Sequence, residues 1–235
     1  MRTTEEYDAL LEQGRRIYAP TRIGRPGRSR AYWPLFVVAQ VLRANWRIRV
    51  EGAHHIAPGP ALLIGNHVSL MDPVTVGITQ RFRMAFFTKV EAYESAGGSF
   101  FRGAGQVPLR RGDEEATNWA LEMSAAMMRM GVKLAVYPEG TRSPDGVSLH
   151  RLHRRVLVPI LQANPGVPVH VMAVAYGPRR RGRIPVSLRF SPPLDLSTVG
   201  TGPNDLTDHV RDELLALGGM PYVDTFGRSV KSERG

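Results

Sequence analysis

Short apolar runs alternate along this chain with longer segments of helical period, and this alternation restricts the fold more than any other feature of the sequence. Strands are predicted at residues 47–51, 61–65, 84–88, 133–137, 169–176 and 186–190. Helices are predicted at residues 73–83, 114–130, 152–163 and 204–217, the second capped by Asp113 and ended by Gly131. We therefore expect an α/β fold, a single layered domain whose central mixed, largely parallel sheet is flanked by helices.

The first 46 residues predict two helices in front of this domain. Thr3 and Glu6 have the spacing of a capping box at the start of the first helix. A linker rich in Pro, Gly and Arg spans residues 20–30, and a second apolar segment follows from Tyr32 to Trp46. Aromatic ends flanked by arginines suit a helix at a membrane interface, and a core helix packed on the domain fits equally well. The main domain is expected at residues 47–217 and an irregular C-terminal tail at 218–235.

Composition narrows the classes of partner and chemistry. The net charge of +10 comes almost entirely from arginine, and it favours anionic lipid headgroups, phosphorylated substrates or nucleic acid. Nucleic-acid binding would need aromatic residues among the basic ones, and the densest run, Arg179 to Arg183, lacks them, so we expect no nucleic acid. The absence of cysteine excludes disulfides, thiolate metal sites and a cysteine nucleophile.

Two further sequence patterns argue against a membrane-spanning helix and against a metal site. The longest apolar stretch has about a dozen residues, short of the roughly 20 that cross a bilayer, so the chain is expected to lie on a membrane without spanning it. His150 and His153 have metal-ligand spacing, but no third ligand is near them in the sequence. We expect no metal site.

A histidine and an aspartate follow the buried strand at residues 61–65, where open α/β sheets place their ligands. Asp72 and Pro73 predict a helix start, so the chain must turn back between His67 and Asp72. A carboxylate at this spacing can fix the imidazole tautomer and leave the other nitrogen to accept a proton. No serine or cysteine in a nucleophile-elbow pattern accompanies the pair, so we expect the proton to come from a substrate hydroxyl. Taken alone, the pair also fits a structural hydrogen bond.

Two more polar segments are expected near the same edge of the sheet. The segment after the strand at 133–137 contains, in order, Glu139, Gly140, Thr141 and Arg142. A guanidinium can bind a phosphate through two parallel hydrogen bonds, and a glycine lets the backbone approach a ligand closely. Arg110 and Arg111 end a segment at residues 105–111 and could complete a phosphate clamp. Each segment by itself also fits a solvated loop.

Together these motifs resemble a known family. His67-x-x-x-x-Asp72, then residues 105–111, then Glu139-Gly140-Thr141-Arg142 resemble, in order and spacing, the glycerolipid acyltransferases of the lysophosphatidic acid (1-acylglycerol-3-phosphate) acyltransferase type. The resemblance covers residues 50–190. The spacing of His67 and Asp72 is unspecific by itself, but together with the downstream block it is a specific signal.

The resemblance implies a membrane-associated O-acyltransferase with no cofactor. His67, oriented by Asp72, would act as general base while a lysophospholipid hydroxyl attacks the thioester of acyl-CoA or acyl-carrier protein. The implied acceptor-site residues are Arg110, Arg111, Glu139, Gly140, Thr141 and Arg142. Residues 1–46 would be a membrane-docking arm and residues 47–217 the acyltransferase domain. The implied location is the cytoplasmic face of the cell membrane, as a peripheral or monotopic protein on anionic lipid.

Two departures from the family pattern leave alternatives open. Where the family has Phe-Lys-x-Gly, residues 152–155 read Leu-His-Arg-Arg, and Val171 stands where the last family block usually has proline. The same transfer to a glycolipid or a lipidated amino acid is therefore one alternative. A non-catalytic membrane-binding protein is the other.

Overall fold

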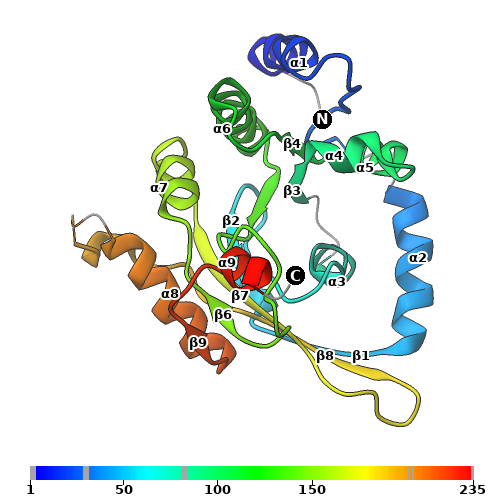
Figure 1. Cartoon of the computed structure of the whole chain (residues 1–235), viewed down its shortest axis with the longest axis vertical. Coiled ribbons are helices and arrows are strands. Elements are labelled where there is room, and N and C mark those ends of the chain that lie inside the picture. Colours follow the sequence, from blue (N-terminus) through cyan, green and yellow to red (C-terminus); the bar gives the residue numbers. More distant parts are fainter. Residues whose placement is uncertain (1–3, 29–31, 81–83, 201, 203, 234–235) are drawn as a thin grey trace.

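The structure is a computed structural model that describes residues 4–28, 32–80, 84–200, 202 and 204–233. A seven-stranded sheet with the order β1-β8-β7-β2-β5-β3-β4 forms its centre (Figure 1). The strands are β1 (Trp46–Glu51), β2 (Leu62–Gly65), β3 (Met84–Lys89), β4 (Val107–Leu109), β5 (Lys133–Val136), β7 (Val169–Tyr176) and β8 (Ile184–Phe190). Neighbouring strands are parallel except β7 and β8. The predicted α/β fold with a mixed, largely parallel sheet is confirmed.

Helices cover both faces of this sheet. The described helices are α1 (Glu5–Ile17), α2 (Tyr32–Asn45), α3 (Asp72–Gln80), α4 (Val90–Glu94), α5 (Gly98–Ala104), α6 (Glu114–Arg129), α7 (Arg154–Gln162), α8 (Asp205–Gly218) and α9 (Gly227–Glu233). Helices α6, α7 and α8 lie on one side, and α2 and α3 on the other (Figure 1). Asp113 caps α6 by accepting a 2.9 Å hydrogen bond from the Ala116 amide, and Gly131 follows its end in a left-handed conformation, as predicted.

Strand β2, which precedes His67, is covered by core residues on both faces of the sheet. Leu62 and Ile64 belong to the core on the side of α6, α7 and α8, whereas Leu63 belongs to the core on the side of α3. Because successive side chains point to opposite faces, a strand covered on both faces must be apolar at every position. The buried strand thus fixes the start of the segment that carries His67.

Helix α1 packs its apolar face on the protein core. Its apolar residues Tyr7 and Leu11 are buried, and α1 packs along α6. The indole of Trp119 in α6 donates a 2.6 Å hydrogen bond to the carbonyl of Leu10. The apolar face of α1 is therefore occupied by protein. The helix is capped by Thr4, which accepts a hydrogen bond from the Tyr7 amide; the cap predicted at Thr3 lies outside the described residues.

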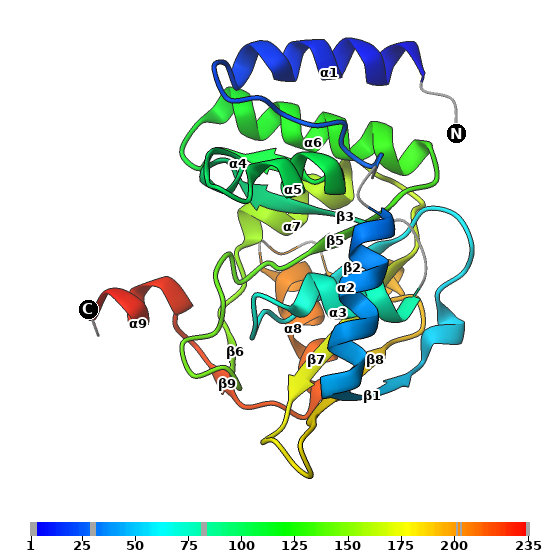
Figure 2. The same ribbon diagram turned by 90° about the vertical axis from the view of Figure 1, so that its right-hand side faces the viewer.

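Helix α2 differs from α1 because it exposes apolar side chains. It contacts α3 and β1, and Figure 2 shows it on the outer side of the molecule, in front of α3. Val37 and Val41 are 49% and 61% exposed and lie one helical turn apart. Over the described residues, no helix is both long and apolar enough to cross a bilayer. The role of α2 in membrane docking stays a prediction.

The expectation of an irregular tail at residues 218–235 is wrong. Strand β9 (Tyr222–Val223) pairs in parallel with β6 (Leu149–His150), and helix α9 follows it. The guanidinium of Arg151 holds the carboxylate of Asp224 through two hydrogen bonds of 3.0 and 2.9 Å. Pairing of this kind depends on contacts distant in sequence, which a polar and aperiodic segment does not reveal.

The packing of α1 on α6 predicts an unusual response to a helix-stabilising substitution. Alanine favours a helix by about 1 kcal/mol over glycine, yet a Cβ at Gly14 would lie 2.3 Å from Cζ2 of Trp119. We expect Gly14→Ala to lower the free energy of unfolding by about 1–3 kcal/mol through overpacking. Gly77→Ala in α3, where a Cβ meets nothing within 4 Å, is the matched control and should raise it. Urea denaturation measures both; an unchanged Gly14→Ala would contradict the packing.

Candidate active site

The candidate site lies at the carboxyl edge of the parallel strands. Strands β2, β5, β3 and β4 are parallel neighbours, so the segments that leave their carboxyl ends share one edge of the sheet. His67 follows β2, Glu139 and Gly140 follow β5, and Arg111 follows β4. The topology therefore brings together three segments that are far apart in the sequence.

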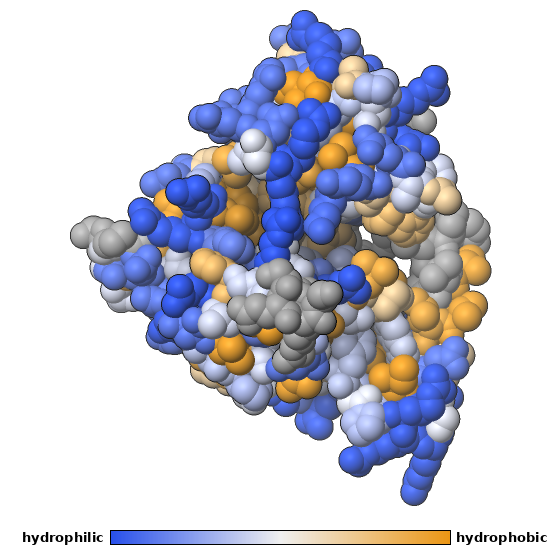
Figure 3. Space-filling model, in the orientation of Figure 1, coloured by the Kyte–Doolittle hydropathy of each residue, from blue (hydrophilic) through white to orange (hydrophobic). Residues whose placement is uncertain are grey.

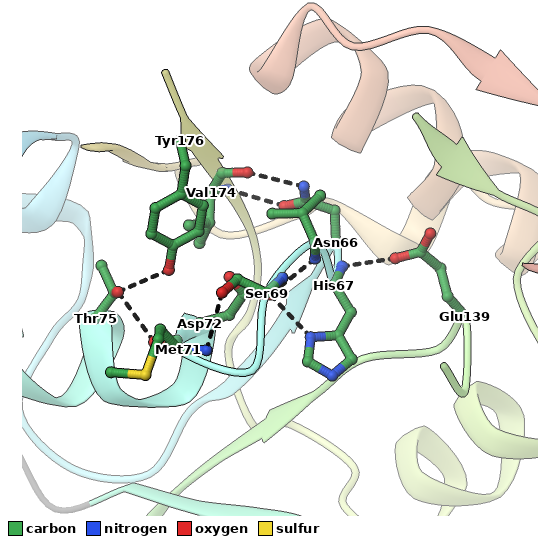
Figure 4. A network of polar contacts seen from close by, with 10 residues as sticks. Asn66, His67, Ser69, Met71, Asp72, Thr75, Glu139, Val174 and Tyr176 are labelled. Carbon is green, nitrogen blue, oxygen red and sulfur yellow. Dashed lines mark hydrogen bonds and ion pairs between the residues drawn. The ribbon is translucent and has the colours of Figure 1, made fainter. Parts of the chain in front are cut away.

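His67 and Asp72 form the predicted pair. Nδ1 of His67 lies 2.8 Å from Oδ2 of Asp72, whose side chain is completely buried (Figure 4). The same oxygen accepts hydrogen bonds of 2.8 Å from the backbone amides of Val68 and Ser69. An ionised carboxylate only accepts, so the neutral ring carries its proton on Nδ1 and leaves Nε2 as a proton acceptor. The His67 side chain is 20% exposed, so a substrate can reach it.

Aromatic rings and hydroxyl groups pack around the His67–Asp72 pair. The His67 ring stacks on Tyr137, with ring centroids 4.6 Å apart. The hydroxyl of Tyr176 lies 2.8 Å from Oγ1 of Thr75, which itself donates to the carbonyl of Met71 at the start of α3 (Figure 4). Burial raises the pKa of Tyr176, and the nearby charge of Asp72 raises it further. Tyr176 therefore stays protonated and can donate within this network.

Glu139 supports the backbone around His67. It is buried, and its Oε2 accepts a 2.6 Å hydrogen bond from the His67 amide while Oε1 accepts one of 2.9 Å from the His150 amide. Burial raises the pKa of Glu139 to about 7, because the two amide hydrogen bonds offset only part of the cost of desolvation. Both oxygens are used inside the protein. Glu139 thus shapes the site by joining two loops.

Arg111 and the glycine after Glu139 form the basic side of the site. The Arg111 guanidinium donates to the carbonyl of Gly140, and burial together with the charge of Arg228 lowers the pKa of Arg111. Gly140 adopts a left-handed conformation, with φ of 66°, and a Cβ there would lie 3.0 Å from Cδ2 of His153. Only glycine suits both conditions. Thr141 and the exposed Arg142 continue the same loop.

Arg110 does not join this cluster. Its guanidinium donates to the carbonyl of Ile17 and to Asp113, both at 3.1 Å, and lies over the ring of Tyr18. These contacts hold the end of α1 to the start of α6. Of the predicted acceptor-site residues, Glu139 contacts the His67 amide and Arg111 contacts Gly140, whereas Arg110 makes its contacts elsewhere.

Three residues that surround the His67–Asp72 pair were not predicted from the sequence: Asn66, Tyr137 and Tyr176. Asn66 is buried and bonds both the carbonyl and the amide of Val174, at 2.9 and 2.8 Å, which ties the end of β2 to β7. A polar residue directly after four apolar strand residues was the available signal. No comparable signal marked Tyr137 or Tyr176. Within the described ranges, no group of three His, Asp or Glu side chains is arranged to hold a metal ion.

The arrangement at this sheet edge agrees with the comparison to protein families. Residues 47–176 match the acyltransferase family. The chain belongs to this family. The acyltransferase match includes both the His67–Asp72 pair and the loop at residues 139–142, so the resemblance seen in the motifs is confirmed.

Relatives within the acyltransferase family include enzymes of phospholipid biosynthesis. The chain is 27% identical over 184 residues to 1-acyl-sn-glycerol-3-phosphate acyltransferase alpha of Mus musculus, covering 73% of this chain and 63% of that protein. It is 28% identical over 104 residues to a chloroplastic 1-acyl-sn-glycerol-3-phosphate acyltransferase of Arabidopsis thaliana, covering 43% and 29%. The chain thus spans less than two thirds of the length of these curated relatives.

A solved structure shares the fold of this chain. The crystal structure of the 1-acyl-sn-glycerophosphate acyltransferase PlsC from Thermotoga maritima aligns with a TM-score of 0.57 and 21% identity. The alignment covers 97% of this chain and 80% of that one. The similarity extends beyond residues 47–176 to nearly the whole chain.

The raised pKa of Glu139 predicts a pH dependence of stability. The unfolded chain releases this proton near pH 4.5 and the folded protein near pH 7, so the folded state binds more protons between these values. The free energy of unfolding should therefore fall as the pH rises through this window, by up to about 3 kcal/mol at about 1.36 kcal/mol per pKa unit. The Glu139→Gln variant should not show this pH-dependent decrease in the free energy of unfolding. Urea denaturation of both proteins from pH 4 to 8 tests it; a difference that is constant with pH would contradict it.

Proposed function

We propose that this chain is a membrane-associated O-acyltransferase acting on a lysophospholipid such as lysophosphatidic acid. The acyl donor is acyl-CoA or acyl-carrier protein, and the reaction uses no cofactor. The supporting observation is the His67–Asp72 pair at the same sheet edge as Arg111 and Gly140. A base beside a cationic wall suits a substrate that carries a hydroxyl and a phosphate. The names of the relatives agree with this substrate class.

In the proposed reaction, Nε2 of His67 takes the proton of the acceptor hydroxyl as its oxygen attacks the thioester carbonyl. The carboxylate of Asp72 stabilises the imidazolium that forms, through the 2.8 Å contact to Nδ1. The tetrahedral intermediate collapses by expelling the thiolate, which takes the proton back from Nε2. The products are the new ester and the free thiol of the donor, and no covalent enzyme intermediate forms.

The backbone amides nearest the base are not available to stabilise the oxyanion. The amide of His67 donates to Glu139, and those of Val68 and Ser69 donate to Asp72. Stabilisation of the tetrahedral intermediate must come from other donors. The guanidinium of Arg111, which reaches the carbonyl of Gly140, is the proposed source, because the Gly140 amide itself donates to the carbonyl of Tyr137. Arg111 and Arg142 also bind the acceptor phosphate.

The proposed membrane contact is made by α2 and by the loop beside the base. Figure 3 shows hydrophobic surface on the side of the molecule where α2 lies in Figure 1. Val37 and Val41 contribute from α2, and Leu70, three residues after the base, is 68% exposed. Apolar side chains bordered by arginines suit the boundary between headgroups and acyl chains. In this proposal the site takes the acceptor lipid from one leaflet, at the cytoplasmic face of the cell membrane.

Removal of the base tests the reaction. We expect His67→Ala to lower kcat for acyl transfer by about 1,000-fold or more, and Asp72→Asn to lower it by a similar factor through loss of the tautomer. The exposed His54→Ala is the matched control and should keep the wild-type rate. Thiol release from a long-chain acyl-CoA with lysophosphatidic acid is measured, and circular dichroism checks the fold. Ordinary turnover by His67→Ala would refute the assignment, and no thioester consumption by the wild type would favour a binding protein.

Substitutions on α2 test the membrane contact without disturbing the core. The double variant Val37→Asn/Val41→Asn should weaken binding to anionic liposomes, measured by sedimentation, by about a hundredfold, since burial of each valine side chain in lipid would contribute about 1.5 kcal/mol. Gln40→Asn, an exposed polar change on the same helix, should leave binding unchanged. Equal binding by the double variant and the wild type would assign the membrane contact to another surface.

A further inference from the structure

The C-terminal strap, residues 221–230, is attached to the chain just after the candidate site. The amide of Leu149 donates to the carbonyl of Pro221 at 2.8 Å, and that of Arg151 to the carbonyl of Thr225 at 3.1 Å. The two hydrogen bonds between Arg151 and Asp224 reinforce this pairing. The strap is thereby held in register with the segment that follows the Glu139–Arg142 loop.

The middle of the strap packs on the basic side of the site. The ring of Phe226 stacks on His153, with centroids 4.4 Å apart and planes 6° apart. His153 is the side chain that limits the space at Gly140. Gly227 is buried, and a Cβ there would lie 3.3 Å from Cγ2 of Thr141. Phe226 and Gly227 therefore lie against the loop that the Arg111 guanidinium contacts.

The next residue of the strap, Arg228, adds a positive charge to this side of the site. Its charge is close enough to lower the pKa of Arg111, after the larger effect of burial. Arg228 itself is exposed, and with the other described residues neither arginine forms an ion pair to a carboxylate. Figure 3 shows hydrophilic side chains around the position that α9 has in Figure 1. The charge of Glu91 acts on the pKa of Arg111 in the opposite direction and to a smaller extent, so the repulsion between the two arginines is favourable to a bound anion.

We propose that the strap forms one wall of the headgroup site and that Arg228 binds the acceptor phosphate together with Arg111. This inference rests on the proposed function and extends it by a residue outside the matched family region, 47–176. A phosphate monoester carries close to two negative charges and three acceptor oxygens at neutral pH, so Arg228 can bind it in addition to Arg111 and Arg142. Arg228 therefore selects acceptors with a phosphate headgroup over neutral acceptors of the same chain length.

Acceptor kinetics test the role of Arg228. Arg228→Ala should raise KM for lysophosphatidic acid by about ten- to a hundredfold, with kcat and the donor KM nearly unchanged. Arg111→Ala should raise the same KM and also lower kcat, because Arg111 is a proposed oxyanion donor as well. Arg228→Lys keeps the charge and should recover part of the loss. With monoacylglycerol, which lacks the phosphate, Arg228→Ala should match the wild type. Arg183→Ala, an exposed arginine in the loop between β7 and β8, is the matched control.

Binding measured without turnover separates failure of this proposal from failure of the proposed function. Isothermal titration of a short-chain lysophosphatidic acid should show weaker binding to Arg228→Ala than to the wild type, whether or not a thioester is consumed. If only Arg111→Ala weakens binding and raises KM, the role of Arg228 is refuted while the acyltransferase proposal stands. An equal loss with monoacylglycerol would also refute it, because it would show a structural effect. Thermal unfolding of Arg228→Ala at the wild-type midpoint confirms that the fold is kept.

Discussion

One buried oxygen, Oδ2 of Asp72, determines the local structure on which the site depends. A carboxylate removed from water is costly unless hydrogen bonds replace its solvation. Here the replacement comes from the His67 ring and from two successive backbone amides, at residues 68 and 69. Those three bonds force the chain to fold back between the end of β2 and the start of α3. The orientation of the imidazole and the path of the loop are therefore consequences of the same desolvated charge.

Glu139 extends this arrangement to a second loop. Its two oxygens join the amide of His67 to that of His150, so the loops after β2 and β5 are held together by one side chain. The next residue, Gly140, presents its carbonyl to Arg111 from a third strand end. Buried acids thus hold the His67 side of the candidate site in place, while arginines border its other side. Glu139 belongs to the shared motif, yet both of its carboxylate oxygens accept hydrogen bonds inside the protein and neither faces a substrate alone.

The sequence predicted the long elements and the His67–Asp72 pair because each has a local signature. Strand β4, of three residues, has none, and without it the position of Arg111 relative to Arg110 was undetermined. Neighbouring residues after a short strand point to different surroundings, so Arg111 reaches Gly140 while Arg110 holds Ile17 and Asp113. Helix α1 shows another limit. An apolar stripe suits lipid and protein equally, and only the position of Trp119 on α6 identifies which one covers it.

The junction between α2 and β1 has a mechanical consequence. The helix ends at Asn45 and the strand begins at Trp46, with no intervening linker to act as a swivel. Trp46 packs edge-on against the ring of Tyr176, whose hydroxyl reaches Thr75 one turn into the helix that carries Asp72. These contacts form a continuous path from the junction of α2 and β1 to the helix that carries Asp72. A membrane contact made by α2 would therefore bear on the surroundings of the His67–Asp72 pair through packed side chains, without a flexible segment in between.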